Sequence, residues 1–211
     1  MATLLKENYL RRLGNGRLVA GPRLMALAQQ VDPKQVIAAA AAPVLSRLSA
    51  RLGCIAQLGT LESDMVTYRI KTGQAAGEFF TRVGLQLEAY CTGIGKVLLA
   101  HLPEAEREAY LATGPFPALT ANTITEPDAL RIELQQVHAQ GHACDDEEIA
   151  EGLVCFAVPL RTSDGQVPAA ISVSLASASA RSPSARERCL KALGQAAQRI
   201  EQEIHTACSA V

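Results

Sequence analysis

The chain has 211 residues, of which 48% are hydrophobic and 19% charged, and its formal net charge is −1. This balance excludes a disordered chain, and the length allows one large or two small domains with a sizeable core. No apolar run approaches the roughly 20 residues of a membrane span. The six scattered cysteines include no C-x-x-C pair, which favours free thiols in a reducing cytoplasm over a disulfide frame or a zinc site. We therefore expect a cytoplasmic globular protein without a metal or another cofactor.

The N-terminal segment predicts a basic hairpin. Residues 3–8 have the pattern of a helix end, and Asn15-Gly16 lies at the centre of a hairpin that runs from Tyr9 to Val19. Residues 1–23 contain five basic residues and one acidic residue, whereas the rest of the chain is acidic. A basic end on an acidic body suggests contact with a polyanion there. A helix end followed by an arginine-bearing hairpin is typical of the second half of a winged helix-turn-helix. An edge hairpin with solvated arginines is the alternative.

Two helices should follow the hairpin. The first is expected over Arg23–Val31. The second begins after Asp32-Pro33, where an N-cap residue precedes a proline at the first helical position. It should run to Leu52 and stop at Gly53, with a kink at Pro43.

The middle of the chain predicts three strands and a glycine-rich helix start. The strands are expected at Cys54–Leu58, Met65–Ile70 and Glu78–Val83, and a helix at Lys96–His101. Glycines at 93 and 95 leave backbone N–H groups exposed before this helix, and such groups attract anions. The spacing does not match a phosphate loop, but it suits a carboxylate site. A tight loop packed against the sheet is the alternative.

The second half of the chain predicts three further helices. They are expected over Pro103–Ala112, from a capping-box variant at Thr125–Asp128 to Gly141, and near the C-terminus. The last helix has an apolar stripe that should lie against the core or a partner subunit: Leu190, Leu193, Ala197, Ile200 and Ile204. Together these elements predict an α+β fold in which helices flank an antiparallel sheet.

The clearest pattern is a hairpin of two long strands, Leu153–Leu160 and Val167–Leu175, around Asp164-Gly165. A two-residue loop there pairs Cys155 with Ser174. Because the side-chain period of a strand is two, one face of the hairpin is apolar and the other holds small and polar side chains. The members of the small polar face are Leu153, Cys155, Ala157, Ser172 and Ser174. This face has room for a small polar ligand, although two serines filling strand positions would give the same pattern.

Three parts of the sequence together resemble the IclR family of bacterial transcription regulators. They are residues 9–17 with 21–27, residues 93–100, and residues 119–125 continuing through Gly141 and residues 145–152 to Ser174. The resemblance spans nearly the whole chain in the family's order. It implies a winged-helix DNA reader joined by a linker helix to a GAF-like effector domain, assembled as homodimers or tetramers.

The resemblance also implies domain bounds. Residues 1–21 would be a partial winged helix, comprising the end of the recognition helix and the wing. Residues 22–31 would be the linker helix, and residues 32–211 the GAF-like effector-binding domain. The first two helices of the DNA reader and most of its recognition helix have no counterpart in the sequence. We therefore expect only weak DNA binding by this chain, through Arg11, Arg12 and Arg17.

In the family a small organic acid lies between a helix N-terminus and the polar face of the sheet. The corresponding ligand-binding residues here are Gly93, Ile94, Asp145, Leu153, Cys155, Ser172 and Ser174, with Phe79 and Leu87 as apolar wall. Glu88 and Tyr90 replace the family's usual Pro and His. This replacement suggests a larger or less acidic effector, and Tyr90 would suit an aromatic ring. The expected effector is a hydroxy, keto or aromatic acid that controls operator binding.

A different class of function remains open. Cys91, Cys144 and Cys155 are expected near the pocket, and His142 lies two residues from Cys144, so the domain could be a GAF-like cysteine-dependent redox enzyme. A reactive thiol needs a nearby base or cation. We expect no enzyme, because His142 and Cys144 are accounted for by the start of a strand. A ligand-free dimerisation module is a third reading, which the polar sheet face argues against.

Overall fold

The computed structural model describes residues 1–30, 32–74 and 81–209 of the chain. The chain divides into two compact units, Met1–Val36 and Ile37–Val211. In the described residues, no helix has the length and apolar character that crossing a membrane requires.

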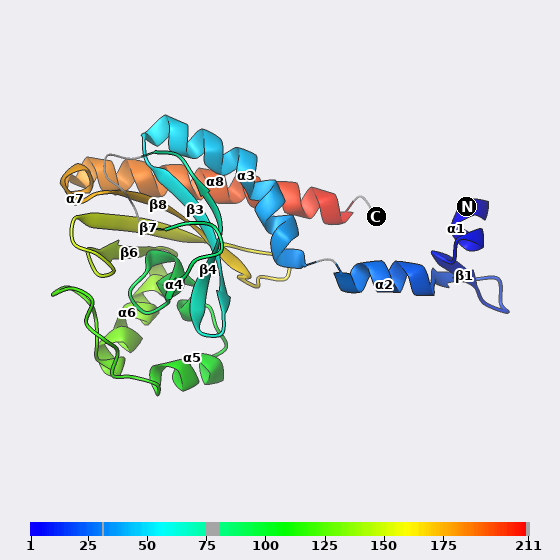
Figure 1. Ribbon diagram of the computed structural model, residues 1–211, viewed down its shortest axis with the longest axis horizontal. Helices are drawn as coiled ribbons and strands as arrows, with labels where there is room; N and C mark the ends of the chain where they lie inside the picture. The colour runs from blue at the N-terminus through cyan, green and yellow to red at the C-terminus, as the bar shows by residue number, and fades with distance from the viewer. Residues whose placement is uncertain (31, 75–80, 210–211) are drawn as a thin grey trace. The chain divides into compact units, whose positions relative to one another are not determined.

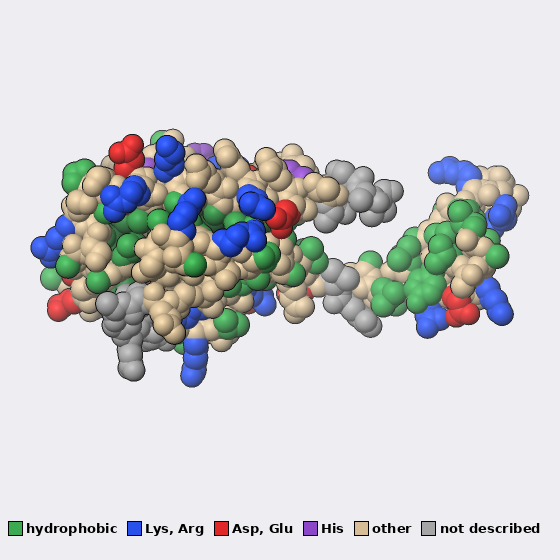
Figure 2. Space-filling model, turned by 90° about the horizontal axis from the view of Figure 1, so that it is seen from above, with side chains coloured by type: hydrophobic (Ala, Val, Ile, Leu, Met, Phe, Trp, Pro, Cys, Tyr) green, Lys and Arg blue, Asp and Glu red, His purple; other side chains and the backbone are tan. Residues whose placement is uncertain are grey.

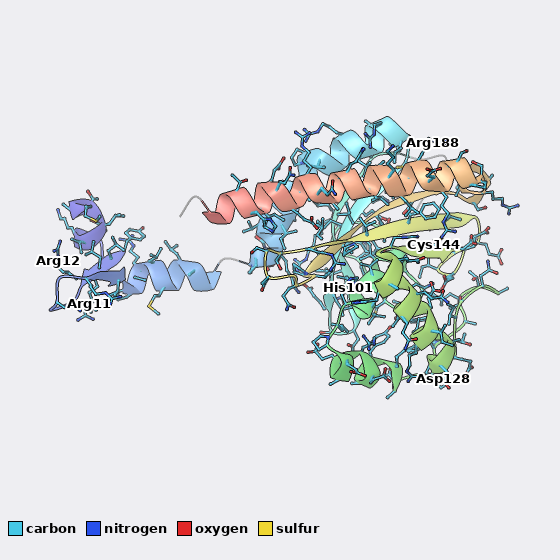
Figure 3. The ribbon with its side chains drawn as sticks, turned by 180° about the vertical axis from the view of Figure 1, so that it is seen from behind. Arg11, Arg12, His101, Asp128, Cys144 and Arg188 are labelled. Atoms are coloured by element: carbon cyan, nitrogen blue, oxygen red, sulfur yellow. The ribbon has the colours of Figure 1, made fainter. Side chains whose placement is uncertain are left out.

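The N-terminal unit contains the predicted basic hairpin. Gly16 has φ +80° and its N–H donates to the Leu13 carbonyl at 2.9 Å, so Asn15-Gly16 forms the turn. Figure 3 shows Arg11 and Arg12 on this hairpin. The helix predicted to end at Val31 is described as far as residue 30. The elements of this unit are α1 (Ala2–Lys6), β1 (Leu10–Arg12), β2 (Leu18–Ala20) and α2 (Pro22–Gln30).

The larger unit is built on an antiparallel sheet. Its strand order in the described chain is β5-β4-β3-β8-β7-β6. In chain order the strands are β3 (Ile55–Glu62), β4 (Met65–Thr72), β5 (Gln86–Glu88), β6 (Ala143–Asp146), β7 (Leu153–Leu160) and β8 (Ala169–Ala176).

Helices cover both faces of this sheet, as the sequence predicts (Figure 1). On one face lie the long helices α3 and α8, and on the other lie α4 and α6. The helices are α3 (Pro33–Leu52), α4 (Gly93–Ala100), α5 (Glu104–Leu111), α6 (Pro127–Gln140), α7 (Ser177–Ala180) and α8 (Pro183–Ser209).

The β7–β8 hairpin separates two cores, because alternate side chains point to opposite faces. Phe156, Ile171 and Val173 pack with α3 and α8 in the first core. Ala157 and Ala170 lie in the second core, together with residues of α4 and α6. The predicted stripe on the last helix packs against the first core of its own domain, with three members buried and Leu190 and Ile204 partly buried.

The predicted register of this hairpin is confirmed, but its loop is longer than expected. Cys155 pairs with Ser174, and Ala157 pairs with Ser172. The second strand begins at Ala169 and not at Val167, because Pro168 has no N–H to donate to the ladder. The turn around Gly165 is closed by a hydrogen bond from its N–H to the Thr162 carbonyl at 2.9 Å.

Three predicted element positions were wrong. Residues 81–83 of the third predicted strand lie outside any strand, because Gly84, with φ +81°, turns the chain before β5. Residues 78–80 fall outside the described residues. Helix α4 begins at Gly93 and not at Lys96, because Thr92 caps it by accepting a hydrogen bond from the Gly95 N–H. The capping box at Thr125 does not form, since Glu126 is the N-cap of α6 and makes no side-chain cap bond.

Other predicted helix signals are confirmed. The Lys34 N–H donates to Asp32 Oδ1 at 2.9 Å at the start of α3. This helix continues through Pro43, and Figure 1 shows it changing direction along its length. Gly141 ends α6 with φ +74°.

Position 95 has no room for a side chain, so a substitution there should affect the stability of the fold. A Cβ at this position would lie 2.2 Å from the Ala89 carbonyl oxygen, a backbone atom that cannot move aside cheaply. We expect Gly95→Ala to lower the free energy of unfolding by about 1–3 kcal/mol, as overpacked core substitutions do. Urea denaturation monitored by circular dichroism measures the change.

Gly194→Ala in α8 is the matched control. A Cβ there meets no described atom within 4 Å, so alanine should stabilise the helix by about 0.5–1 kcal/mol. Equal midpoints for Gly95→Ala and the parent would show that α4 does not depend on this close approach.

Candidate functional site

The candidate site is a cavity between the small polar face of the sheet and the N-terminus of α4. Most of the predicted ligand-binding residues line it: Leu87, Gly93, Ile94, Asp145, Leu153, Cys155, Ser172 and Ser174. The predicted wall residue Phe79 lies outside the described residues. Residues that the sequence reasoning missed also line the cavity: Gln57, Tyr68, Thr81, Thr92 and Ile149.

The polar side chains of the cavity are hydrogen-bonded to one another. Gln57 Nε2 donates to Thr81 Oγ1 at 2.7 Å. Its Oε1 accepts from Ser174 Oγ at 3.1 Å and from Ser172 Oγ at 3.5 Å. The remaining cavity is about 10 Å³, the room of about one water molecule. A ligand must therefore separate these side chains to enter. In the sequence, the only hint of a role for Gln57 is that it is the one amide side chain in the apolar run 54–58.

The N-terminus of α4 supplies backbone donors to the same cavity. The first N–H groups of a helix have no acceptor inside the helix, and Gly93 and Ile94 occupy these positions. A Cβ on Gly93 would lie 3.4 Å from the Cys155 carbonyl oxygen, an ordinary van der Waals contact, so the start of the helix lies directly against the sheet. These amides and the positive end of the helix dipole favour an anion.

Asp145 contributes a carboxyl group to the site, and one of its two oxygens lacks a hydrogen-bond partner among the described residues. It is fully buried. Its Oδ1 accepts from the backbone N–H of Glu148 at 2.8 Å and from that of Ile149 at 3.3 Å. Its buried Oδ2 has no hydrogen-bond partner among the described residues. Burial, and then the nearby Glu148 carboxylate, raise the pKa of Asp145 to about 7. Near neutral pH this carboxyl group can therefore donate or accept a hydrogen bond.

Side chains of residues 120–123 donate hydrogen bonds to backbone carbonyls of the turn that carries Asp145. Thr120 Oγ1 donates to the Glu147 carbonyl at 2.7 Å. Asn122 Nδ2 donates to the Asp146 carbonyl at 3.0 Å, and Thr123 Oγ1 donates to the Glu148 carbonyl at 2.8 Å. These contacts account for the threonine- and asparagine-rich segment before α6, whose role the sequence pattern did not reveal.

Lys96 of α4 does not line the cavity, but it contacts the turn that carries Asp145. The sequence reasoning did not identify it as a functional residue. It is only 1% exposed, and its ammonium forms ion pairs with the carboxylates of Glu133 and Glu148. Burial lowers the pKa of Lys96, but the two carboxylates outweigh it and raise the pKa above its ordinary value.

Glu88 and Tyr90 lie outside the cavity. Neither is among the described residues that line the cavity. Tyr90 is buried elsewhere, where its hydroxyl donates to the Pro117 carbonyl at 2.7 Å and its ring stacks on Phe116. The expectation that Tyr90 faces an aromatic effector was therefore wrong.

The cysteines lack the surroundings of a reactive thiol. Only Cys155 of the three lines the cavity. Burial raises the pKa of Cys91 and of Cys144 to about 12, and raises the pKa of Cys155 well above its ordinary value. A nucleophilic thiol needs the opposite shift. His142 is half-buried, and its Nδ1 lies 3.2 Å from the Gln140 carbonyl oxygen. Nothing in this arrangement supports the redox-enzyme alternative.

A second hollow lies between α3 and α8 and has a different character. Figure 2 shows Lys and Arg side chains gathered over the face that carries these helices. The hollow is open, about 360 Å³ in volume, and is rimmed by Arg47, Arg51 and Arg199. Its buried members are apolar: Val44, Leu48, Ala192 and Ala196. Because it has no buried polar group, we place the candidate site at the first cavity.

The fold and the first cavity together define a class of protein. A curled antiparallel sheet between two helical layers, with a small pocket between the sheet and a helix N-terminus, is a GAF-like ligand-sensing domain. The family described as "Bacterial transcriptional regulator IclR C-terminal" matches residues 29–202. This chain belongs to the IclR family of transcription regulators and carries its effector-binding C-terminal domain.

Individual relatives agree with this assignment. The Pca regulon regulatory protein of Pseudomonas putida is 34% identical over 174 residues, which are 82% of this chain and 60% of that protein. The HTH-type transcriptional regulator XynR of Escherichia coli (strain K12) is 35% identical over 176 residues, covering 82% of this chain and 70% of that protein. The chain therefore spans less than two thirds of the first of these relatives.

A solved relative has a bound ligand. The crystal structure of an IclR homolog from Microbacterium hydrocarbonoxydans, in complex with 4-hydroxybenzoate, superposes with a TM-score of 0.76 at 28% sequence identity. The superposition covers 97% of this chain and 83% of that chain.

Proposed function

We propose that this chain is the ligand-sensing part of a transcription regulator whose binding to operator DNA responds to a small organic acid. The observation that carries the proposal is that one cavity holds both free hydrogen-bond donors and a carboxyl oxygen without a partner among the described residues. Backbone N–H groups at Gly93 and Ile94 favour a carboxylate, while the orphan oxygen of Asp145 needs a hydrogen-bond partner. A ligand with an acid at one end and a hydroxyl at the other meets both needs. The 4-hydroxybenzoate bound by the solved relative has this chemistry.

The proposed organisation follows from the sequence and the two units. Residues 1–21 form the end of a recognition helix and the wing, residues 22–31 the linker helix, and residues 32–211 the effector domain. The first compact unit ends in the sequence at Val36, a few residues after the proposed end of the linker. In a bacterial cell such a regulator acts in the cytoplasm.

Assembly as a homodimer or tetramer is part of the proposal. Helix α2 exposes three large apolar side chains, Leu24, Met25 and Leu27, which are 41%, 56% and 44% exposed. Such residues on one short helix suit a contact with a second copy. The stripe on α8 gives no such support, because it packs against the domain's own core.

The first prediction for this site concerns the serine hydroxyls. Hydrogen bonds to charged groups contribute about 1.5–3 kcal/mol each, so Ser172→Ala or Ser174→Ala should weaken acid binding about ten- to a hundredfold. A thermal-shift panel of small organic acids, including 4-hydroxybenzoate, selects the ligand. A ligand at 100 times its dissociation constant adds about 2.7 kcal/mol of stability. Calorimetry then gives the affinities.

Ser49→Ala is the matched control for the serine variants. Ser49 is also buried, but it lies in α3 and donates to the Ser46 carbonyl at 3.2 Å. This variant should bind as the parent does. Unchanged affinity in both cavity variants would remove the polar sheet face as the effector site.

The second prediction concerns pH and rests on Asp145. An ionised Asp145 repels a ligand carboxylate, so the neutral form binds more tightly than the ionised form, and binding takes up a proton above the pKa of about 7. The affinity should be nearly constant below pH 7 and should fall up to about tenfold per unit above it. Calorimetry between pH 6 and 8.5, in buffers of different ionisation enthalpy, measures both affinity and proton uptake.

Asp145→Asn tests the assignment of this titration. The amide does not ionise, so the affinity of this variant should not change with pH over the same range. An affinity of the parent that stays constant or rises with pH would contradict the role of Asp145.

The third prediction concerns DNA. Arg11, Arg12 and Arg17 are exposed on the N-terminal unit, and phosphate contacts carry no sequence information. We expect weak, sequence-independent binding. Three contacts give a slope of about −2.7 for log affinity against log salt. Replacing all three with alanine should abolish this binding in a fluorescence anisotropy titration.

The control for DNA binding removes the same charge elsewhere. Replacing Arg47, Arg51 and Arg199 of the α3–α8 hollow with alanine should leave DNA binding unchanged. An equal loss in both triple variants would indicate attraction by overall charge. A sequence-specific footprint at physiological salt would show that this chain reads an operator unaided.

A further inference from the structure

Lys96 has a role that the effector site itself does not explain. A buried ammonium is costly unless charges and hydrogen bonds compensate it. In the described chain Lys96 is among the largest fully buried side chains, although a leucine would fill this position without a charge. Its ammonium contacts the Glu148 carboxylate, Glu133 Oε1 at 3.2 Å and the Cys144 carbonyl oxygen at 3.3 Å.

Two of these contacts hold the ends of the turn that carries Asp145. The Cys144 carbonyl lies directly before Asp145, and Glu148 closes the turn. The Glu148 N–H then donates to Asp145 Oδ1 at 2.8 Å. A continuous chain of contacts therefore runs from the Lys96 ammonium, through Glu148, to the carboxyl group in the cavity.

The charges of this chain act on Asp145 in opposite directions. Burial raises the pKa of Asp145 most, the Glu148 carboxylate raises it further, and the Lys96 ammonium lowers it. The other titratable groups that face Asp145 are uncharged near neutral pH, because burial raises the pKa of each: Tyr68 of β4, Cys91 before α4, Cys144 of β6 and Cys155 of β7. Beside burial and the backbone hydrogen bonds that Asp145 accepts, the charges of Lys96 and Glu148 therefore shift the pKa of Asp145 in opposite directions.

We propose that Lys96 is a positioning residue of the effector site, which fixes the turn at Asp145 and, with Glu148, sets the charge that the cavity presents there. The consequence for effectors rests on the proposed function. An ionised Asp145 accepts a hydrogen bond and selects acids that carry a second donor, whereas a neutral Asp145 donates and tolerates acids that lack one. Lys96 influences this choice without touching the ligand.

The test uses the ligand-free protein and measures Asp145 directly. Carbon-13 NMR of labelled aspartate carboxyl groups gives a titration midpoint for each residue, and the signal missing from Asp145→Asn identifies Asp145. Lys96→Met should move the midpoint up by about one pH unit, and Glu148→Gln should move it down by a similar amount. The double variant should return the midpoint towards that of the parent.

The opposite signs separate this role from a merely structural one. Loosening the turn would move the midpoint in the same direction in both single variants. A shift of the same sign in both, or no shift in either, overturns the proposal. Glu133→Gln is the control, because Glu133 contacts Lys96 but is not part of the turn at Asp145; its midpoint should stay close to that of the parent.

Folding failure does not prevent the test. Lys96→Met leaves the Glu148 carboxylate buried without its cation, and a buried unpaired charge is strongly destabilising. Lys96→Gln is therefore the second lysine variant, because its side-chain amide removes the charge and can still donate a hydrogen bond to Glu148. A higher midpoint in Lys96→Gln then supports the proposal, and an unchanged or lower one overturns it.

Ligand binding forms a separate arm of the experiment. Calorimetry with 4-hydroxybenzoate and with benzoate, which lacks the hydroxyl, compares the parent with Glu148→Gln at pH 7. The variant should prefer 4-hydroxybenzoate over benzoate more strongly than the parent does. If the midpoints shift as expected but neither probe binds, the proposed acid effector is wrong and the role of Lys96 stands. If both probes bind and the midpoints do not move, the proposed function stands and the role of Lys96 is wrong.

Discussion

The two-residue period of β7 and β8 is the constraint on which the rest of the domain depends. It directs Phe156, Ile171 and Val173 to the core under α3 and α8. The same alternation directs alanine, cysteine and serine side chains to the other face, under α4. Because these side chains are small, the N-terminus of α4 comes close enough to form one wall of the cavity. A register shift of one residue would exchange the two faces and remove both the core and the site.

The cavity combines groups that are fully hydrogen-bonded with one group that is not. Gln57 joins Thr81 and the two serines, so this wall has little need for solvent or ligand. Asp145 keeps one oxygen without a partner among the described residues, and leaving such a group buried costs about 1–3 kcal/mol. A ligand that satisfies this oxygen recovers some of that free energy while it disrupts the amide–serine wall. The balance of these two effects determines which acids bind.

Much of this arrangement was predictable from sequence, because it depends on local patterns. Asp164-Gly165 and the alternation around it gave the pairing of Cys155 with Ser174. The glycines at 93 and 95 indicated the anion-binding helix start, although the cap at Thr92 shifted that start by one turn. The roles of Gln57 and Lys96 were not predictable, because their partners are distant in sequence. Gln57 meets Ser174 across 117 positions, and Lys96 meets Glu148 across 52. A sequence period or a motif does not report contacts between distant residues. The pattern also did not show that the chain turns at Gly84, so that no strand forms over residues 81–83.

The small volume of the cavity has a consequence for how sensitive the domain is as a sensor. About 10 Å³ of free space among the described residues does not hold an organic acid, so an acid binds to a more open conformation than this one. The apparent dissociation constant is then the intrinsic one divided by the open fraction. An open fraction of about 1% raises the working concentration about a hundredfold with no change in any ligand contact. The hydrogen bond between Gln57 and Thr81 belongs to the closed form. A stronger Gln57–Thr81 hydrogen bond therefore raises the ligand concentration at which the domain responds, and it does so without changing which ligand the domain recognises.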